Sequence, residues 1–371
     1  MIIGVDAREL QGRPTGTGRY LRSLIRAWTS EDSDDRIVAY FNGPTPDDAA
    51  LLAPRVTCRS LAPRAVRGLL WQEHLLPRAL RQDRIAVFFA PAYTCPLGTT
   101  VPRVTTVHDL SFFAVPQDFR WLDGLRRRLL VGASVRASRR IVAVSAFTKR
   151  EITSRFPDAA ARVREIPHGP DDDLPPPPPR HEARDRLGVS GPFVLTVGTV
   201  LNRRRLPVLI QAVALVSRRH PGLILEVVGD NRTHPPQDLT RLAKRVGLSG
   251  RFRLSGFVSD RDLVVRYAAA DVAVFLSDYE GFGLPALEAA ARSVPLVVST
   301  RPSLGEIFAQ AALTVEPTDP DAVALALDRA LVDAPTRARL QAEGLALAAR
   351  HSWARTASLT RQALVEAVAG R

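Results

Sequence analysis

Residues 276–300 read LSDYEGFGLPALEAAARSVPLVVST, and this stretch decides the fold. The apolar run 273–276 that leads into it is typical of a buried parallel strand. The sequence EGFG at 280–283 then forms a glycine loop, and Pro285 is suited to open a helix because the missing N–H of proline is not needed there. The stretch therefore predicts a strand, a glycine loop and a helix N-terminus in direct succession.

A loop of this kind suits a phosphate group. Amides at a helix N-terminus attract anions together with the helix dipole, and Gly281 and Gly283 let the backbone approach closely. Glu280 lies in the loop and Glu288 one turn into the helix. A sugar nucleotide needs donors for its diphosphate and acceptors for its ribose and hexose hydroxyls, so these residues predict a sugar-nucleotide site. The alternative is an ordinary amphipathic helix with a solvated Glu288.

Composition favours a soluble protein of two domains. A chain of 371 residues, 46% of them hydrophobic and 24% charged, is long enough for two separate cores. The chain starts directly with a strand pattern, and the uncharged stretch 85–102 is broken by prolines, so we expect neither a secretory signal nor a membrane span. Cys58 and Cys95 lack metal-ligand companions and fit a reducing compartment. We therefore expect a cytoplasmic protein.

The net charge of +13 favours anionic partners. Nucleic acid is not expected, because neither zinc-finger spacing nor an aromatic stacking strip accompanies the charge. Arginines gather among leucines and valines at positions 126, 127, 128, 136, 139 and 140. This basic amphipathic helix has two interpretations: peripheral contact with the anionic inner face of a membrane, or a solvated face packed on the sheet through Leu125, Leu129 and Leu130. We favour the second.

The first half of the chain alternates strands and helices. We expect strands at 2–5, 37–41, 86–89, 104–107 and 141–144, and a glycine loop at 12–18 that leads into a helix at 20–28. Gly16 and Gly18 lack the third glycine of a dinucleotide fingerprint, which disfavours an NAD enzyme. His108 follows a predicted strand directly, at the end where open α/β sheets place ligand sites.

The second half repeats the pattern after five prolines at 175–179, the best candidate for a domain boundary. We expect strands at 193–197, 224–228, 253–255, 272–275 and 296–298, with a basic loop at 198–205 after the first of them. Asp260 and Asp319 are expected helix caps. Asp171 and Asp173 could resemble a metal-binding pair, but their place beside the linker favours solvated acids.

The Glu280-x7-Glu288 spacing resembles the signature of the retaining glycosyltransferases of family 4, also called group 1. Further segments match that family at 2–8 (IIGVDAR), 106–110 (TVHDL), 144–145 (VS), 198–205 (GTVLNRRR) and 351–353 (HSW). The resemblance implies an α/β fold of GT-B architecture, two Rossmann-like domains with a deep inter-domain cleft. Residues 1–174 would form the acceptor-side domain, with the C-terminal helix 352–371 packed back on it, and residues 180–350 the nucleotide-sugar domain.

The resemblance also implies roles for single residues. His108 would support the reacting sugar, Arg203 and Arg204 the diphosphate, Glu280 the hexose hydroxyls and Glu288 the ribose. The donor site as a whole would comprise Gly16, Gly198, Val258, Gly281, Phe282, Gly283, Leu284 and Glu288, with the backbone around Val258 bordering the base. The chain departs from the family where Arg204 replaces a lysine and where Leu201 and Asn202 replace an acidic residue and a proline.

The resemblance implies a retaining hexosyltransferase, which we expect to be metal-independent and without a cofactor. It would move mannose or glucose from a nucleoside diphosphate sugar to a hydroxyl of a glycan or lipid-linked acceptor. A sugar-nucleotide-binding protein without transfer activity, for which the altered loop at 201–205 argues, and a sugar-nucleotide epimerase are the alternatives.

Overall fold

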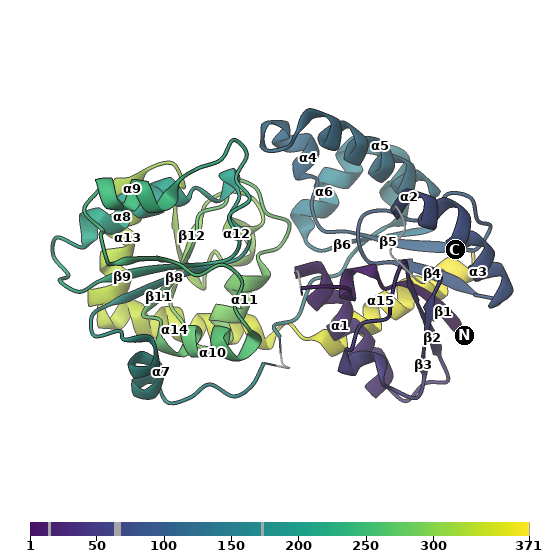
Figure 1. Cartoon of the computed structure of the whole chain (residues 1–371), viewed down its shortest axis with the longest axis horizontal. Helices are drawn as coiled ribbons and strands as arrows, with labels where there is room; N and C mark the ends of the chain where they lie inside the picture. Colours follow the sequence, from purple (N-terminus) through teal and green to yellow (C-terminus); the bar gives the residue numbers. More distant parts are fainter. Residues whose placement is uncertain (14–15, 63–67, 172–173, 371) are drawn as a thin grey trace. The chain divides into compact units, whose positions relative to one another are not determined.

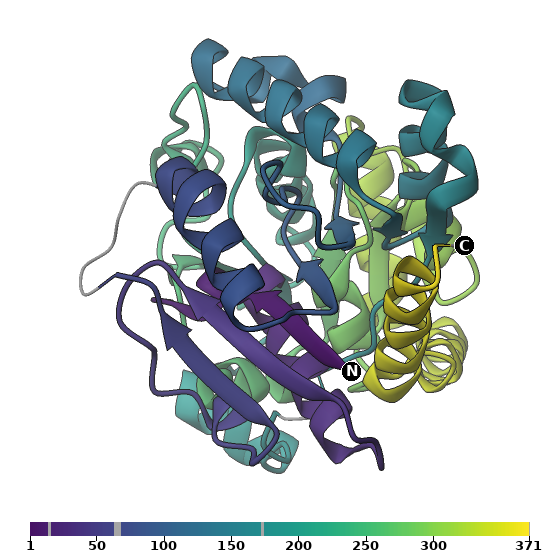
Figure 2. The same cartoon turned by 90° about the vertical axis from the view of Figure 1, so that its right-hand side faces the viewer.

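The computed structural model of the chain describes residues 1–13, 16–62, 68–171 and 174–370. The chain divides into two compact units. Unit 1 comprises Met1–Leu110, Leu122–Gly169 and Ser352–Arg371, and unit 2 comprises Ser111–Trp121 and Pro170–His351. Both ends of the described chain therefore belong to unit 1 (Figure 2).

The described part of unit 1 is built on a parallel sheet of seven strands in the order β3-β2-β1-β4-β5-β6-β7. The strands are β1 (Ile2–Asp6), β2 (Arg36–Phe41), β3 (Val56–Ser60), β4 (Val87–Ala90), β5 (Arg103–Val107), β6 (Arg140–Ala143) and β7 (Val163–Glu165). Strand β4 is apolar along its whole length and β5 is buried beyond its first residue, because helices cover both faces of the sheet (Figure 1).

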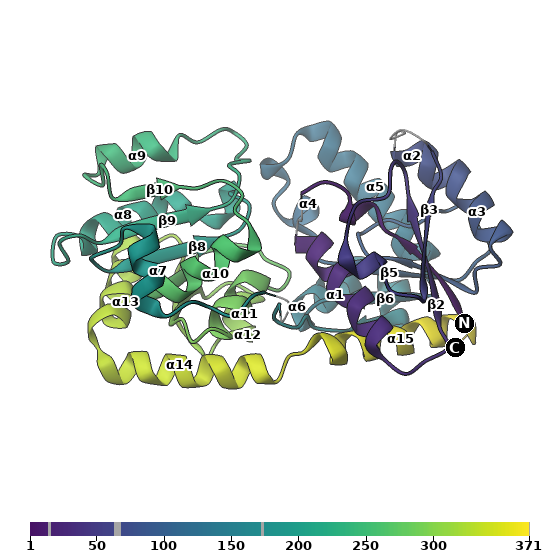
Figure 3. The same ribbon diagram turned by 60° about the horizontal axis from the view of Figure 1, so that its bottom comes forward.

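Helices and short helical turns connect these strands. They are η1 (Arg8–Leu10), α1 (Gly16–Ser30), η2 (Ala49–Leu51), α2 (Gly68–Leu70), the π-helix η3 (Trp71–Leu75), α3 (Leu76–Gln82), α5 (Trp121–Ala137), α6 (Ala146–Arg155), η5 (Pro157–Arg162) and α15 (Trp353–Val368). The last of them, α15, lies beside α1 (Figure 3). Trp28 Nε1 donates to the carbonyl of Ala357 at 2.9 Å, and Glu366 accepts from Arg140 and Arg164 at 2.7 and 3.0 Å. The C-terminal segment is thus bonded to helix α1 and to strands β6 and β7.

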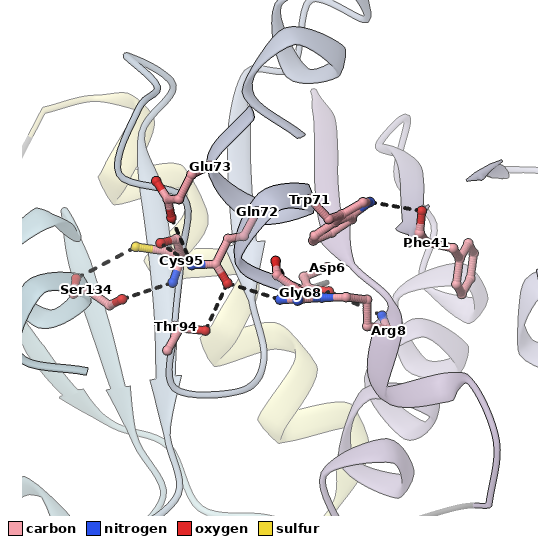
Figure 4. A network of polar contacts seen from close by, with 10 residues as sticks. All are labelled: Asp6, Arg8, Phe41, Gly68, Trp71, Gln72, Glu73, Thr94, Cys95 and Ser134. Atoms are coloured by element: carbon pink, nitrogen blue, oxygen red, sulfur yellow. Dashed lines mark hydrogen bonds and ion pairs between the residues drawn. The ribbon is translucent and has the colours of Figure 1, made fainter. Parts of the chain in front are cut away.

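Arg8 ties the carboxyl end of β1 to neighbouring elements (Figure 4). Its guanidinium donates to the Asp6 carboxylate at 2.6 and 2.9 Å and to Gln72 Oε1 at 3.1 Å, and it lies 4.3 Å from the Trp71 ring centroid. Trp71 in turn donates to the carbonyl of Phe41 at 3.0 Å. Burial alone would lower the pKa of Arg8, but Asp6 raises it, so the cation persists. This network fixes β1, β2 and the π-helix together.

Unit 2 contains a parallel sheet of six described strands in the order β10-β9-β8-β11-β12-β13. They are β8 (Phe193–Val197), β9 (Ile224–Val228), β10 (Phe252–Leu254), β11 (Val272–Phe275), β12 (Leu296–Ser299) and β13 (Ala312–Val315). The helical elements are α4 (Ser111–Ala114), η4 (Pro116–Asp118), α7 (Arg180–Leu187), η6 (Asn202–Arg204), α8 (Leu206–Val216), α9 (Leu239–Arg245), α10 (Asp260–Ala269), α11 (Leu284–Ala290), α12 (Leu304–Ile307), α13 (Pro320–Val332) and α14 (Ala334–Ala349). An apolar cluster from α8, α9, α13 and the sheet forms its main core.

The strands that the sequence analysis missed, β3, β7 and β13, lie at sheet edges. Edge strands are partly exposed and carry polar residues, so β3 (VTCRS) and β7 (VRE) lack the apolar run that marks a central strand. The Asp319 cap is confirmed, since its side chain accepts from the amides of Asp321 and Ala322. The Asp260 cap is wrong: Ser259 caps α10, and Asp260 is its first residue.

The unit boundaries differ from the expected ones by a few residues. Residues 170 and 171 already belong to unit 2, where the carbonyl of Asp171 accepts from Arg292 at 3.4 Å, and Leu174 is buried. Ser111–Trp121 also joins unit 2, which no feature of the sequence indicated. Asp173 lies outside the described residues.

The interpretation of α5 as a helix packed through its leucines is wrong. Leu125 and Leu129 are 38% and 65% exposed, and Leu122 is 69% exposed. The side that is buried instead carries Gly124, Val131, Gly132, Ser134 and Val135. Small residues let that face approach its neighbours, so the leucines are left on the surface.

Gly169 provides a steric test of the fold. A Cβ at Gly169 would lie 2.6 Å from the carbonyl carbon of Ser352 and against the amide of Trp353, which are backbone atoms that cannot rotate away. Gly169→Ala should lower the free energy of unfolding by about 1–3 kcal/mol, as overpacking does. Thermal melting measures it, with Gly98→Ala as control, because a Cβ there meets its nearest atom at an ordinary 3.5 Å. Equal melting temperatures for the two variants would contradict the close crossing at Gly169.

Candidate functional site

The candidate site lies at the carboxyl ends of β8 and β11 in unit 2. These strands are neighbours, but the chain continues from β8 to β9 on one side and from β11 to β12 on the other. Loops that leave adjacent strands in opposite directions open a crevice at this edge, where doubly wound sheets bind ligands. The fold thus brings the predicted basic loop at 198–205 next to the predicted glycine loop at 280–283.

Two contacts pin these loops to each other. The amide of Asp278 donates to the carbonyl of Arg203 at 2.8 Å, and Arg205 Nε donates to Asp278 Oδ2 at 2.6 Å. Burial raises the pKa of Asp278, an effect that the Arg205 guanidinium opposes. Arg205 itself has a left-handed backbone with φ of 50°, unusual for a residue other than glycine. The sequence analysis gave Asp278 no role, although it stands just after a strand and two positions before Glu280.

Arg204 lies within the pinned loops. Its Nη1 donates to the carbonyl of Val197 at 3.0 Å, and its Nη2 is 3.5 Å from Glu280 Oε2, which also accepts from Ser277 Oγ at 3.1 Å. Its Nε is buried and has no hydrogen-bond partner among the described residues. A Cβ at Gly198 would lie 2.9 Å from the Arg204 guanidinium carbon, so glycine there makes room for this cation.

The rest of the glycine loop leads into α11. Gly283 has φ of +93°, which favours glycine, and a Cβ there would lie 2.5 Å from Leu304 Cδ2. Phe282 is buried, with its ring centroid 5.9 Å from that of His351. Leu284 begins α11 and Pro285 follows it, as the sequence predicted. Gly281 lies between these residues and Glu280.

Glu288 is not solvated. Glu288 is only 1% exposed, and its Oε2 accepts a hydrogen bond from the hydroxyl of Tyr267 in α10 at 3.0 Å. The interpretation of α11 as an ordinary amphipathic helix with an exposed Glu288 is therefore wrong. Val258 is half-buried in the loop between β10 and α10, at the same edge of the sheet. Tyr267 carried no signal in the sequence, because one aromatic residue inside a helix is usually core.

Unit 1 holds two further predicted residues, His108 and Gly16. His108 follows β5, and its ring nitrogen Nε2 donates to the carbonyl of Pro91 at 2.7 Å. The ring packs against Tyr20 and His168 at centroid distances of 5.0 and 5.6 Å. Burial lowers the pKa of His108, so the imidazole is neutral and its Nδ1 is an acceptor. Gly16 is the first residue of α1, directly after positions outside the described chain.

Trp353 stacks on His168 at a centroid distance of 5.6 Å in the same cluster, as a packing residue should. Over the described ranges, no group of three or more histidine, cysteine, aspartate or glutamate side chains could hold a metal ion. No helix in the described part of the chain is long and apolar enough to cross a bilayer.

Comparison with known proteins identifies the family. The model of the glycosyl transferases group 1 matches residues 180–346, and that of Glycosyltransferase Family 4 matches residues 14–174. The O-antigen chain mannosyltransferase B of Escherichia coli is 32% identical over 285 residues, which cover 74% of this chain and 73% of that protein. The chain belongs to the group 1, family 4 glycosyltransferases.

Solved structures of the same fold cover the chain end to end. Sucrose-phosphate synthase from Thermosynechococcus elongatus superimposes with a TM-score of 0.80 at 20% identity, over 100% of both chains. HepE from Anabaena in complex with UDP-glucose superimposes with a TM-score of 0.75 at 20% identity, over 100% of this chain and 99% of that one. This glycosyltransferase therefore has the expected GT-B architecture of two Rossmann-like units.

The lowered pKa of the half-buried His108 predicts a pH-dependent stability. Folding lowers the pKa of His108 from its ordinary 6.5. Below that pH the unfolded state therefore binds more protons than the folded state, and the free energy of unfolding decreases as the pH decreases. Urea unfolding between pH 5 and 8 should show this loss in the wild-type glycosyltransferase and a smaller loss in His108→Gln. His74→Gln, at an exposed histidine of unit 1, is the control and should follow the wild type. Parallel profiles for wild type and His108→Gln would refute a buried neutral imidazole.

Proposed function

We propose that this glycosyltransferase is a retaining hexosyltransferase that moves mannose or glucose from a nucleoside diphosphate sugar to an acceptor hydroxyl. The main support is Arg204 within 3.5 Å of Glu280 at the switch point of the unit 2 sheet. The diphosphate needs a cation such as Arg204, and the sugar hydroxyls donate hydrogen bonds to a carboxylate such as Glu280. The mannosyltransferase activity in the relative's name and the UDP-glucose bound by HepE agree with both hexoses.

The chemistry assigned to Arg204 is stabilisation of the leaving diphosphate. As the bond between the sugar C1 and the β-phosphate oxygen breaks, negative charge grows on the phosphate, and a preorganised cation lowers the barrier. The buried Nε of Arg204 supplies a donor that a phosphate oxygen can satisfy. Arg203 and the backbone at Gly283 and Leu284 would add donors. Arginine binds phosphate through two N–H groups, so the replacement of the family's lysine is compatible with catalysis.

The remaining residues would orient the donor. Glu280 would accept from hexose hydroxyls, Glu288 from the ribose, and the backbone near Val258 and Gly198 would border the base and the diphosphate. The neutral His108 and Gly16 would act on the donor from unit 1. The departing phosphate would take the acceptor's proton on the face it leaves, which retains the configuration at C1 without a carboxylate nucleophile. Cationic side chains would neutralise the diphosphate, as a metal ion does in other transferases.

Two alternatives use the same nucleotide site. A protein that binds sugar nucleotides without transferring the sugar would show donor affinity and no product. An epimerase would change the sugar nucleotide in the absence of any acceptor. The acceptor in our proposal is a glycan or lipid-linked saccharide, in keeping with the name of the relative, O-antigen chain mannosyltransferase B.

The test is a transfer assay in excess EDTA with GDP-mannose and UDP-glucose, on wild type, Arg204→Ala and Arg204→Lys. Wild type should form a product of unchanged anomeric configuration by NMR. Arg204→Ala should lower kcat about a hundredfold, as the loss of one preorganised donor does, with a smaller effect on donor affinity. Arg204→Lys should regain part of that rate.

Three results would count against the proposal. Equal rates in all three proteins would remove Arg204 from the mechanism, and inversion at C1 would refute retention. Loss of activity in EDTA that magnesium restores would refute metal independence. Donor binding without turnover across a broad panel of acceptors would favour the non-catalytic binding protein.

We further propose that unit 1 contacts an anionic membrane through α5. Leu122, Leu125 and Leu129 recur at helical spacing and are 69%, 38% and 65% exposed, so they form one apolar stripe. Arg126 and Arg127 beside them are exposed as well. An apolar stripe flanked by arginines is the pattern that enters the boundary between headgroups and acyl chains of acidic bilayers. It would bring the enzyme to a lipid-linked acceptor.

Vesicle sedimentation tests this contact with the leucine-to-serine double variant at positions 125 and 129. The wild-type enzyme should bind vesicles with phosphatidylglycerol at least about tenfold better than pure phosphatidylcholine, and salt should weaken the binding. The double variant should lose most of that affinity, since it removes buried apolar area. Leu325→Ser is the matched control, because Leu325 in α13 of unit 2 is 70% exposed. Equal losses in variant and control, or no lipid preference, would refute the contact.

A further inference from the structure

Tyr267 links two helices that border the candidate donor site in unit 2. It lies in α10, two turns after Ser259, and its residue is 1% exposed. Its hydroxyl is 3.0 Å from Glu288 Oε2 and 3.3 Å from the carbonyl of Pro285, both in α11. An ionised carboxylate only accepts hydrogen bonds, so the hydroxyl of Tyr267 is the donor.

Arg292 supports the same arrangement. Its Nη1 donates to the carbonyl of Glu288 at 3.1 Å, and its guanidinium carbon lies 5.5 Å from the centroid of the Tyr267 ring. Tyr267 therefore contacts both the carboxylate of Glu288 and the guanidinium of Arg292, which follows the end of α11. A buried side chain with these neighbours has little freedom to rotate.

We infer that Tyr267 is a positioning residue that sets the selectivity of the enzyme for nucleotides with intact ribose hydroxyls. The inference rests on the proposed role of Glu288 as the ribose acceptor. A carboxylate discriminates between ribose and deoxyribose only if its lone pairs point in a fixed direction, and the bond from Tyr267 fixes the rotation of the carboxyl group. A carboxylate has lone pairs for further donors after it accepts one hydrogen bond.

The geometry also explains why a tyrosine stands here. Burying a carboxylate is costly unless it is hydrogen-bonded, and the tyrosine hydroxyl meets that need without neutralising the charge.

The experiment measures calorimetric affinities for UDP, GDP and their 2′-deoxy and 3′-deoxy counterparts. Wild type should prefer the ribonucleotide over at least one deoxy form by about tenfold or more, the range expected for one hydrogen bond to a charged group. Tyr267→Phe keeps the ring and removes the hydroxyl, and it should reduce that preference at least about fivefold. Binding of the deoxynucleotide should change little, because it lacks the hydroxyl that Glu288 receives.

Tyr40→Phe is the matched control. Tyr40 is a buried tyrosine of unit 1 whose hydroxyl donates to Asp83 Oδ2 at 2.6 Å, so the substitution deletes the same kind of bond. Both phenylalanine variants should lose some thermal stability, but Tyr40→Phe should keep the full preference for ribonucleotides. A general loss of stability therefore cannot imitate the predicted result.

Glu288→Gln separates this inference from the proposed function. If Glu288→Gln loses the preference and Tyr267→Phe keeps it, Tyr267 does not position the carboxylate and the inference is overturned. If Glu288→Gln keeps the full preference, Glu288 does not bind the ribose and both fail. Loss of the preference in Glu288→Gln and Tyr267→Phe, with Tyr40→Phe unchanged, supports both.

Discussion

The hydrogen bond from the amide of Asp278 to the carbonyl of Arg203 is the constraint on which the proposed donor site depends. It joins the loops that follow the neighbouring strands β8 and β11 of the unit 2 sheet. With Arg205 bonded to Asp278, the loops hold Arg204 and Glu280 within 3.5 Å. The parallel sheet supplies the crevice, and these backbone and side-chain bonds determine which charges line it.

The ion pair of Arg204 and Glu280 contributes little to the stability of the fold but is suited to bind a diphosphate sugar. Its side chains are only 16% and 21% exposed, so both ions have lost most of their hydration, a cost that mutual attraction at this separation only partly offsets. The buried Nε of Arg204 adds a donor without an acceptor among the described residues. A diphosphate sugar would satisfy that donor and offer hydroxyls to Glu280, so the site is costly when empty and complementary when filled.

The sequence predicted the central strands and the strand, glycine loop and helix N-terminus at 273–290, because apolar runs and glycines are local signals, and the roles assigned to single site residues stay predictions. It failed where burial depends on distant partners. The leucines of α5 were expected to be buried. In the structure, the side of the helix that carries Gly124 and Gly132 is buried instead. The sequence also allowed a solvated Glu288, because its partner Tyr267 comes from another helix. The edge strands β3 and β7 are too polar to be recognised as strands from their sequence.

A crystal structure of the enzyme with UDP or GDP tests the central claim most directly. The account predicts the β-phosphate within about 3 Å of Arg204 Nε, the distance of a charge-assisted hydrogen bond, between the loops that Asp278 joins. It also predicts ribose hydroxyls at Glu288, on the side of α11 that Tyr267 contacts. A nucleotide bound away from the carboxyl ends of β8 and β11, or one whose phosphates face Arg205 while Arg204 stays bonded to Glu280, would contradict it.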